Sequence, residues 1–234
     1  MISFVIPAYN EEALLASCIA SIVVEMKTDY EIIVVDNGST DLTANIARYF
    51  STKVINEPTK GVVWARQAGY AEAQGDLIAF IDADSEVPNG WLAIMLRAMS
   101  DNRVVACSGP LVYTDMNLAK RIMTSAFYTI GSLLSRILPM VQGGNFVARK
   151  SALKAVDGFD TSIEFYGEDT KTAIRLSGVG RVAFVPGMFV WSSARRLNAE
   201  GFLTIGARYL INYLWMQLTG RAWSKSYRDV RSSN

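Results

Sequence analysis

The 234-residue sequence contains no histidine. This absence excludes histidine general bases, Ser-His-Asp triads and histidine-ligated zinc, because each of them requires an imidazole. Any chemistry performed by the chain must use carboxylates, hydroxyl groups, arginine, lysine or a hard metal ion. Cysteine is scarce as well, since Cys18 and Cys107 are the only two and lie far apart in apolar runs. We expect buried thiols and no disulfide framework, which fits a reducing compartment.

The sequence also lacks a large net charge and a clean membrane-spanning run. The net charge of +1 gives no overall attraction to nucleic acid, so no nucleic-acid partner is expected. Residues 122–135 are uncharged but too short to span a bilayer, and residues 202–218 are interrupted by Arg208. The first residues have neither the basic nor the long apolar stretch of a signal peptide. We therefore expect a cytoplasmic protein.

What the sequence does contain is an alternation of strand-like and helix-like segments. Apolar runs at residues 2–6, 31–36 and 77–82 predict strands, and residues 11–26 and 61–74 have helical periodicity. Strands that alternate with helices predict an α/β fold with a mostly parallel central sheet flanked by helices. The length predicts a single domain.

The second half of the chain is less regular. Residues 104–113 predict one strand, residues 118–138 a helix, and residues 143–146 a turn that leads into another strand.

Carboxylates occur where the first strands end. Asp82-Ala83-Asp84 follows a buried strand, and Asp36 ends another. Ligands bind beyond the carboxyl ends of parallel strands, so these residues should converge on one crevice. Two hard oxygen donors near a diphosphate suit Mg²⁺ or Mn²⁺. The alternatives are a solvated turn at Asp82 and Asp84, and a helix cap at Asp36 that Ser39 or Thr40 would otherwise supply.

Two further charged pairs lie in the second half of the chain. Glu168 and Asp169 open a predicted helix, and with histidine absent a carboxylate is the best available general base. The alternative is a favourable interaction of both carboxylates with the helix dipole. Arg195 and Arg196 are adjacent and suit a phosphate group, although they equally suit a solvated basic turn.

Together these motifs resemble glycosyltransferase family 2. The resemblance runs from about residue 2 to residue 196, and its motifs occur in order at residues 5–12, 31–41, 81–84, 143–146, 158–160 and 167–169. It implies a GT-A type fold and inverting transfer of a sugar from a nucleotide-diphosphate donor, with UDP favoured. It further implies a nucleotide-sugar half at residues 1–100, an acceptor half at residues 101–200 and a C-terminal helical segment at residues 201–234.

The resemblance assigns roles to individual residues. The expected donor-binding residues are Pro7, Tyr9, Glu11, Asp36, Arg66, Asp82, Ala83 and Asp84. Asp84, together with Asp82, would hold Mn²⁺ or Mg²⁺, and Asp169 would be the catalytic base. The residues expected on the acceptor or phosphate side are Gly144, Asn145, Glu168, Arg195 and Arg196.

The chain also departs from the family pattern. Many members use a later histidine as a metal ligand, and this chain has none, so we expect the donor itself to complete the metal site. The Gln-x-x-Arg-Trp motif of processive members is absent too. This absence favours the addition of one sugar over the synthesis of a polymer.

The sequence allows more than one identity for the acceptor and more than one role for the C-terminal segment. The acceptor would be a sugar, a lipid-linked molecule or another hydroxyl or phosphate, as in cell-envelope glycan or glycolipid synthesis. Tyr209, Tyr213, Trp215 and Trp223 lie among apolar and basic residues, which suits a helix at the inner face of a membrane, ordinary packing or an oligomer interface. Two rival functions are a non-catalytic sugar-nucleotide-binding protein and a sugar-phosphate nucleotidyltransferase. The latter normally has a glycine-rich phosphate loop after the first strand, where this chain has none.

Overall fold

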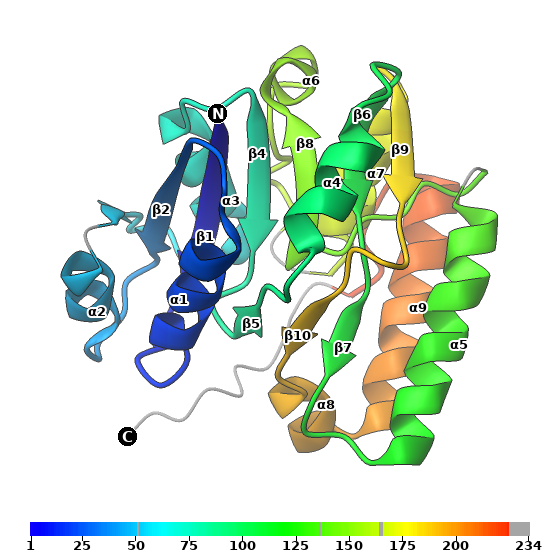
Figure 1. Ribbon diagram of the computed structural model, residues 1–234. Coiled ribbons are helices and arrows are strands. Elements are labelled where there is room, and N and C mark those ends of the chain that lie inside the picture. Colours follow the sequence, from blue (N-terminus) through cyan, green and yellow to red (C-terminus); the bar gives the residue numbers. More distant parts are fainter. Residues whose placement is uncertain (51, 136, 164–165, 225–234) are drawn as a thin grey trace.

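A computed structural model describes residues 1–50, 52–135, 137–163 and 166–224, which form an α/β fold with helices on both faces of a central sheet (Figure 1). Within these residues the central sheet has seven strands, in the order β3 (Lys53–Asn56), β2 (Tyr30–Asp36), β1 (Ile2–Ala8), β4 (Leu77–Ile81), β8 (Asn145–Arg149), β6 (Val104–Ser108) and β9 (Arg181–Phe184). Neighbouring strands are parallel except at β8, which is antiparallel to β4 and β6. The predicted mostly parallel sheet is confirmed.

The helices pack on the sheet as two layers because side chains alternate between its faces. Phe4 and Ile6 of β1 join one apolar cluster, and Val5 between them joins the other. The first cluster contains residues of α1 (Leu15–Glu25), α2 (Thr43–Tyr49) and α4 (Trp91–Met99). The second contains residues of α3 (Val62–Glu72), α6 (Lys150–Ala155) and α7 (Glu168–Ser177).

A small second sheet corrects one prediction. Residues 104–113 are not one strand, because Gly109 and Pro110 separate β6 from β7 (Leu111–Tyr113). A Cβ on Gly109 would lie 1.8 Å from the carbonyl oxygen of Met188, so the chain passes too close to its neighbour for any side chain. β7 instead pairs with β10 (Val190–Ser192), which also pairs with β5 (Ser85–Glu86).

Two long helices, α5 (Leu118–Leu134) and α9 (Phe202–Thr219), lie side by side at one edge of the molecule (Figure 1). The Lys120 ammonium lies 5.9 Å from the ring centre of Phe202, which places the first turns of both helices together. Farther along, the Tyr213 hydroxyl donates to the carbonyl of Leu138 at 3.0 Å. The short helix α8 (Arg195–Glu200) precedes α9. Among the described residues, no helix has both the length and the hydropathy of a membrane span.

The strand ends define where a ligand can bind. β1, β2 and β4 run parallel, so their last residues share one edge of the sheet. Asn145, the first residue of the antiparallel β8, pairs with Ile81 at the same edge. Strands from residues 1–100 and from residues 101–200 thus meet there in one sheet, and the charged motifs of both parts come together.

Candidate active site

A pocket of about 300 Å³ lies at this edge of the sheet. Most of the residues expected at the site line it, namely Pro7, Glu11, Arg66, Asp82, Ala83, Asp84, Gly144, Glu168, Asp169, Arg195 and Arg196. Tyr9, Asp36 and Asn145 do not line it. Both Cys18 and Cys107 are buried and free, as expected.

Arg66 is the central cation of the pocket wall. It lies on α3 and is 2% exposed, and its Nη2 donates to Oδ1 of Asp82 at 2.9 Å. Its Nη1 pairs with Oε1 of Glu168, the first residue of α7. Burial alone would lower the pKa of Arg66, but the charges of Glu168 and Asp82 outweigh burial and raise it. Arg66 therefore remains protonated and joins α3, the end of β4 and the start of α7.

Glu168 keeps unused hydrogen-bonding capacity in this cluster. Burial raises its pKa to about 7, while the positive charge of Arg66 acts in the opposite direction. Its second oxygen, Oε2, is buried and has no hydrogen-bond partner among the described residues. A buried acceptor of this kind usually has a partner, so the atom is suited to a ligand hydroxyl.

Two glycines make room for these side chains. A Cβ on Gly144 would lie 2.3 Å from Oδ2 of Asp82, and one on Gly143 would lie 2.8 Å from Nη1 and Nη2 of Arg66. Gly144 also accepts a backbone hydrogen bond from Asp82 at 3.3 Å. The Gly-Gly pair before β8 thus allows the backbone to approach the Arg66–Asp82 ion pair directly.

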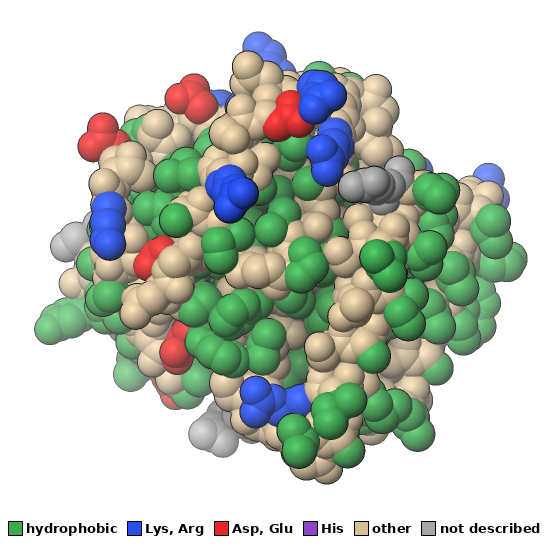
Figure 2. All heavy atoms as spheres, turned by 45° about the vertical axis from the view of Figure 1, so that its right-hand side comes forward, with side chains coloured by type: hydrophobic (Ala, Val, Ile, Leu, Met, Phe, Trp, Pro, Cys, Tyr) green, Lys and Arg blue, Asp and Glu red, His purple; other side chains and the backbone are tan. Residues whose placement is uncertain are grey.

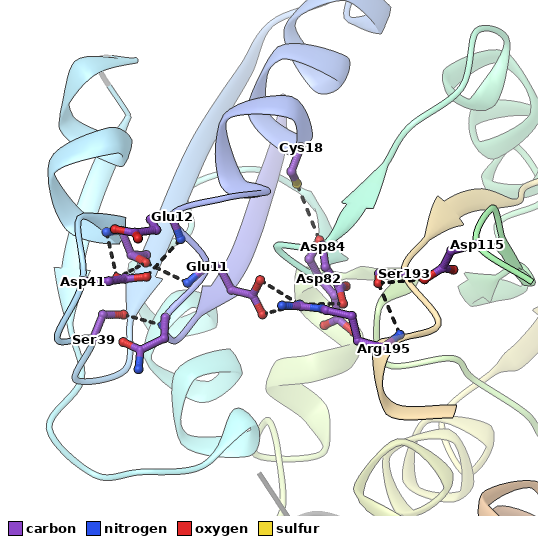
Figure 3. A network of polar contacts seen from close by, with 12 residues as sticks. Glu11, Glu12, Cys18, Ser39, Asp41, Asp82, Asp84, Asp115, Ser193 and Arg195 are labelled. Carbon is purple, nitrogen blue, oxygen red and sulfur yellow. Dashed lines mark hydrogen bonds and ion pairs between the residues drawn. The ribbon is translucent and has the colours of Figure 1, made fainter. Parts of the chain in front are cut away.

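A second ion-pair cluster holds the carboxylates at the end of β1 and after β4 (Figure 3). Nη2 of Arg195, the first residue of α8, lies 2.7 Å from Oε1 of Glu11 and 3.1 Å from Oδ2 of Asp84. Burial, followed by the nearby charges of Asp82 and Glu11, raises the pKa of Asp84 to about 6, and Arg195 opposes this rise. Oxygen donors of like charge are thus held close together beside one guanidinium group.

Asp115 positions the start of α8. Its Oδ1 accepts a hydrogen bond from the backbone N–H of Ala194 at 2.8 Å. Its Oδ2 accepts one from the Ser193 hydroxyl at 3.4 Å (Figure 3). These bonds join the loop after β7 to the turn that carries Arg195. The sequence gives no local signal for them, because the partners are 78 and 79 residues apart.

Asp169 lines the same pocket, in the first turn of α7. Its Oδ1 accepts a hydrogen bond from the backbone N–H of Thr170 at 2.7 Å. Burial raises the pKa of Asp169, while the hydrogen bonds of Thr170 and the charge of Arg66 oppose that rise. A carboxylate with a raised pKa on a pocket wall is suited to accept a proton.

The described residues offer fewer than three protein ligands for a metal ion. In the part of the chain that the structure describes, no group of three or more histidine, cysteine, aspartate or glutamate side chains could hold one. Asp84 and Asp82 are nevertheless hard oxygen donors, and Mg²⁺ or Mn²⁺ commonly takes one or two carboxylates with phosphate oxygens and water. Burial and then repulsion from Asp82 and Glu11 raise the pKa of Asp84, and a cation would relieve that repulsion. The residues present therefore fit a divalent ion whose remaining ligands would come from a diphosphate.

Tyr9, in the loop after β1, and Asp36, the last residue of β2, do not line the pocket. The Lys60 ammonium donates to the Tyr9 hydroxyl at 3.1 Å, and Oδ1 of Asp36 accepts from the Ser39 N–H at 3.1 Å. The alternative cap residues do not cap the following helix: Ser39 accepts from the Asn10 N–H, and Thr40 donates to the Asn10 side chain.

The sequence interpretation missed Asn37, which organises the same region. Its amide donates to the carbonyls of Glu57 at 2.9 Å and Thr59 at 2.7 Å and accepts from the Gly61 N–H at 2.8 Å. The segment after β3 is thereby fixed to the end of β2. An asparagine between Asp36 and a glycine was the available signal, but it is equally typical of a simple turn.

Asn145 is a structural residue in this fold, not part of the pocket wall. Its side chain is fully buried, donates to the carbonyl of Met188 at 2.6 Å and accepts from the Trp91 indole at 3.1 Å. The amide faces the core that joins β8, α4 and the segment before β10, and not the pocket.

The sequence interpretation also missed the aromatic end of the pocket. Phe127 and Tyr128 come from α5, Tyr209 and Tyr213 from α9, and Met140 from the connection after α5. Their signal was the helical periodicity that also predicts ordinary packing. The pocket is thus charged where the strands end and aromatic between α5 and α9.

Comparison with known proteins identifies the family. The sequence profile described as glycosyl transferase family 2 matches residues 3–157, which is more than half of the chain. The chain belongs to glycosyl transferase family 2. The predicted family is therefore confirmed for this chain.

Curated relatives of this family 2 chain include two glycosyltransferases. The probable glycosyltransferase YdaM of Bacillus subtilis is 31% identical over 81% of this chain and 50% of its own length. The glycosyltransferase AglE of Haloferax volcanii is 33% identical over 50% of this chain and 41% of its own length. The chain spans half or less of the length of these two relatives.

Solved structures show the same fold. The mannosyltransferase PcManGT from Pyrobaculum calidifontis, in complex with GDP-Man and Mn²⁺, matches with a TM-score of 0.76 at 20% identity, covering 94% of this chain and 65% of that one. Glucosyl-3-phosphoglycerate synthase from Mycobacterium tuberculosis, in complex with Mn²⁺ and UDP-Glc, has a TM-score of 0.66 at 24% identity, covering 93% and 78%. The expected GT-A type fold of this family 2 chain is confirmed.

Proposed function

We propose that this family 2 chain transfers one sugar from a nucleotide-diphosphate sugar to an acceptor, with inversion at the anomeric carbon. The observation that carries the proposal is that the Glu11–Asp84–Arg195 cluster and Asp169 line the same pocket. Relatives with the same fold bind GDP-Man or UDP-Glc together with Mn²⁺, which supports such a donor. UDP is the nucleotide that we favour, and residues 1–100 would supply most of the donor contacts.

The charged end of the pocket would hold the diphosphate. Asp84, with Asp82, would bind Mn²⁺ or Mg²⁺, and that ion would neutralise charge on the departing diphosphate. Arg195 would contribute a guanidinium group to the phosphate oxygens, for which its planar donors are suited. Pro7 and Glu11 line the pocket, and Tyr9 after β1 and Asp36 at the end of β2 would face the nucleoside.

Asp169 would act as the catalytic base on the acceptor side. Its carboxylate would take the proton of the acceptor hydroxyl, and the acceptor oxygen would form a bond to the anomeric carbon from the face opposite the diphosphate. The bond between that carbon and the diphosphate oxygen would break, with its electron pair leaving on the diphosphate. An acceptor phosphate, already ionised, would attack without this proton transfer. Oε2 of Glu168 is available for a sugar hydroxyl, since it has no partner among the described residues.

A thermal-shift panel with UDP-, GDP- and dTDP-sugars, each with and without Mn²⁺, tests the donor assignment. We expect one nucleotide to raise the melting temperature, and the rise to need the metal. Asp84→Asn should abolish the metal-dependent rise. Asp76→Asn is the matched control, because that side chain is 97% exposed in an ion pair with the N-terminus. A donor shift that is independent of both metal and Asp84 would contradict the proposal.

The same preparation separates the rival functions. A non-catalytic binding protein would show the shift but no product with any acceptor, and a nucleotidyltransferase would form a nucleotide-sugar from a sugar phosphate and a nucleoside triphosphate.

The ¹H NMR coupling constant of the anomeric proton in the product tests the stereochemistry. Retention of the donor configuration would refute the inverting mechanism.

A further inference from the structure

The helices α5 and α9 expose an unusual amount of apolar surface. The large hydrophobic side chains that they leave exposed are Leu118, Ile122, Met123, Phe127, Ile130, Leu133 and Leu134 on α5, and Leu203, Tyr209, Leu210, Ile211, Leu214, Trp215 and Leu218 on α9. Leu133 is 76% exposed and Leu218 is 83% exposed. Figure 2 shows hydrophobic side chains over this side of the molecule. A contiguous apolar face of this kind on a folded protein normally has a partner.

The charged side chains within the two helical segments are all basic. Residues 117–135 and 201–224 contain no aspartate or glutamate, whereas they contain Lys120, Arg121, Arg208 and Arg221. Of these, Arg208 is paired at 3.2 Å with Glu200, which precedes α9. Arg121 and Arg221 are exposed. Trp215 and Trp223, which are 45% and 54% exposed, add amphipathic rings to the same segment. Apolar, aromatic and basic side chains without acidic ones match the boundary between the headgroups and the acyl chains of an anionic membrane.

The same face reaches the pocket. Phe127 of α5 and Tyr209 of α9 line the pocket, yet they are 42% and 40% exposed. Tyr128 and Tyr213 line it from the same two helices and are more deeply buried. The aromatic end of the pocket therefore opens between α5 and α9 onto the apolar face. An acceptor that entered there would pass from an apolar surface to Asp169.

We propose that the exposed face of α5 and α9, with Phe127 and Tyr209 at its pocket opening, docks on an anionic lipid bilayer and receives a lipid-linked acceptor from it. The inference rests on the proposed function, because it places the acceptor side of that pocket toward the bilayer. The helices would lie in the plane of the interface, which needs no helix long enough to cross the membrane. Both apolar burial and attraction of the basic residues to anionic headgroups would contribute.

Flotation with lipid vesicles tests the docking surface. We expect the chain to float with phosphatidylcholine vesicles that contain phosphatidylglycerol, and less with phosphatidylcholine alone. Binding should weaken as salt rises, because the attraction between basic residues and headgroups is screened. Ile122→Glu combined with Leu218→Glu should weaken vesicle binding at least about tenfold, since each charge opposes insertion. Val24→Glu is the matched control, as Val24 is a 73% exposed apolar residue on α1.

Site-specific labels test the orientation of the pocket opening. Cys18 and Cys107 are buried, so an environment-sensitive fluorophore can be attached selectively to Ile122→Cys, Phe127→Cys or Val24→Cys. Anionic vesicles should shift the emission of labels at positions 122 and 127 to the blue and leave the label at position 24 unchanged. A shift at position 24 alone would overturn the proposal. A shift at position 122 without one at position 127 would overturn the placement of the pocket opening.

Other occupants of the face are outcomes of the same tests. Absence of flotation with either vesicle type would overturn the proposal. So would a concentration-dependent dimer in analytical ultracentrifugation that the Ile122→Glu, Leu218→Glu variant disrupts, because a second copy would then cover the face. The metal-dependent thermal shift with a water-soluble nucleotide-sugar does not involve this face. A chain that shows the shift but no flotation would thus refute the docking surface and leave the donor assignment intact.

Discussion

Replacement of Gly144 by alanine should disturb the Asp82 side chain, because the added Cβ has no room beside it. The new Cβ would lie 2.3 Å from Oδ2 and 2.7 Å from Cγ of Asp82, far inside contact distance. Asp82 has little room to retreat, since Arg66 holds its carboxylate at 2.9 Å and Glu168 holds Arg66 from the other side. Either the ion pair lengthens or the start of β8 moves away from the end of β4.

The expected loss of stability has two contributions, the overpacking by the new methyl group and the weakened ion pair. Inserting a methyl group into a packed site usually costs about 1–3 kcal/mol of unfolding free energy. Weakening the ion pair adds at most about 1 kcal/mol, because the Asp82 side chain is 36% exposed. For a chain of this size, 1 kcal/mol lowers the melting temperature by roughly 2–4 °C, so a total cost of about 1–4 kcal/mol predicts a decrease of roughly 2–16 °C. Metal-dependent donor binding should weaken as well, since Asp82 is displaced.

Gly206→Ala is the matched control for this experiment. Gly206 is exposed on α9 and has nothing within 4 Å of an added Cβ. Alanine is favoured over glycine in a helix by about 0.5–1 kcal/mol, so the control should be stabilised. Differential scanning calorimetry and a donor titration measure both quantities. A Gly144→Ala variant that melts within about 1 °C of the wild type and binds the donor normally would refute the proposed packing of Gly144 against Asp82.

Three further predictions concern charges in the pocket. Glu168→Gln should gain stability relative to the wild type as pH rises from about 4.5 to about 7, by up to about 1.4 kcal/mol per pH unit. The reason is that folded Glu168 retains a proton that the unfolded chain releases. Urea titrations of both proteins at several pH values measure this difference, and an unfolding free-energy difference that does not change with pH would contradict it. Arg195→Gln should weaken binding of the nucleotide-sugar by about tenfold or more through loss of a charge-assisted hydrogen bond to phosphate, measured by calorimetry; unchanged affinity would exclude that contact. The acid limb of kcat/KM against pH should have its midpoint above the ordinary aspartate pKa of 3.8, because the base must be ionised and burial raises the pKa of Asp169. A midpoint at or below 3.8 would argue against Asp169 as the base.

The strand-end part of the site was predictable from local sequence. Apolar runs such as residues 77–81 identify buried strands, and the rule that parallel strands end at one edge brings Asp82 and Glu11 together without any structural knowledge. The pocket indeed contains both. Arg66 was assigned to the donor side by resemblance, and it lies beside Asp82 as a buried ion-pair partner.

The remaining features depend on contacts between distant segments. β5 and β10 have two and three residues, too few for a period-two pattern, and they pair across more than 100 positions. The inward orientation of Asn145 follows from its register opposite Ile81 and from partners at Trp91 and Met188, none of which is near it in sequence. The amphipathic pattern of α5 likewise predicts a helix without specifying that one face opens a pocket.

Turnover by Asp169→Asn tests the central claim most directly. The amide is nearly isosteric with the carboxylate but does not take a proton from an acceptor hydroxyl. The substitution should leave the metal-dependent thermal shift with the donor unchanged and lower kcat at least about a hundredfold, which is the low end of general-base effects. Retained donor binding with that loss of kcat is the predicted result. A kcat close to that of the wild type, with a hydroxyl acceptor, would contradict the assignment of Asp169 as the base.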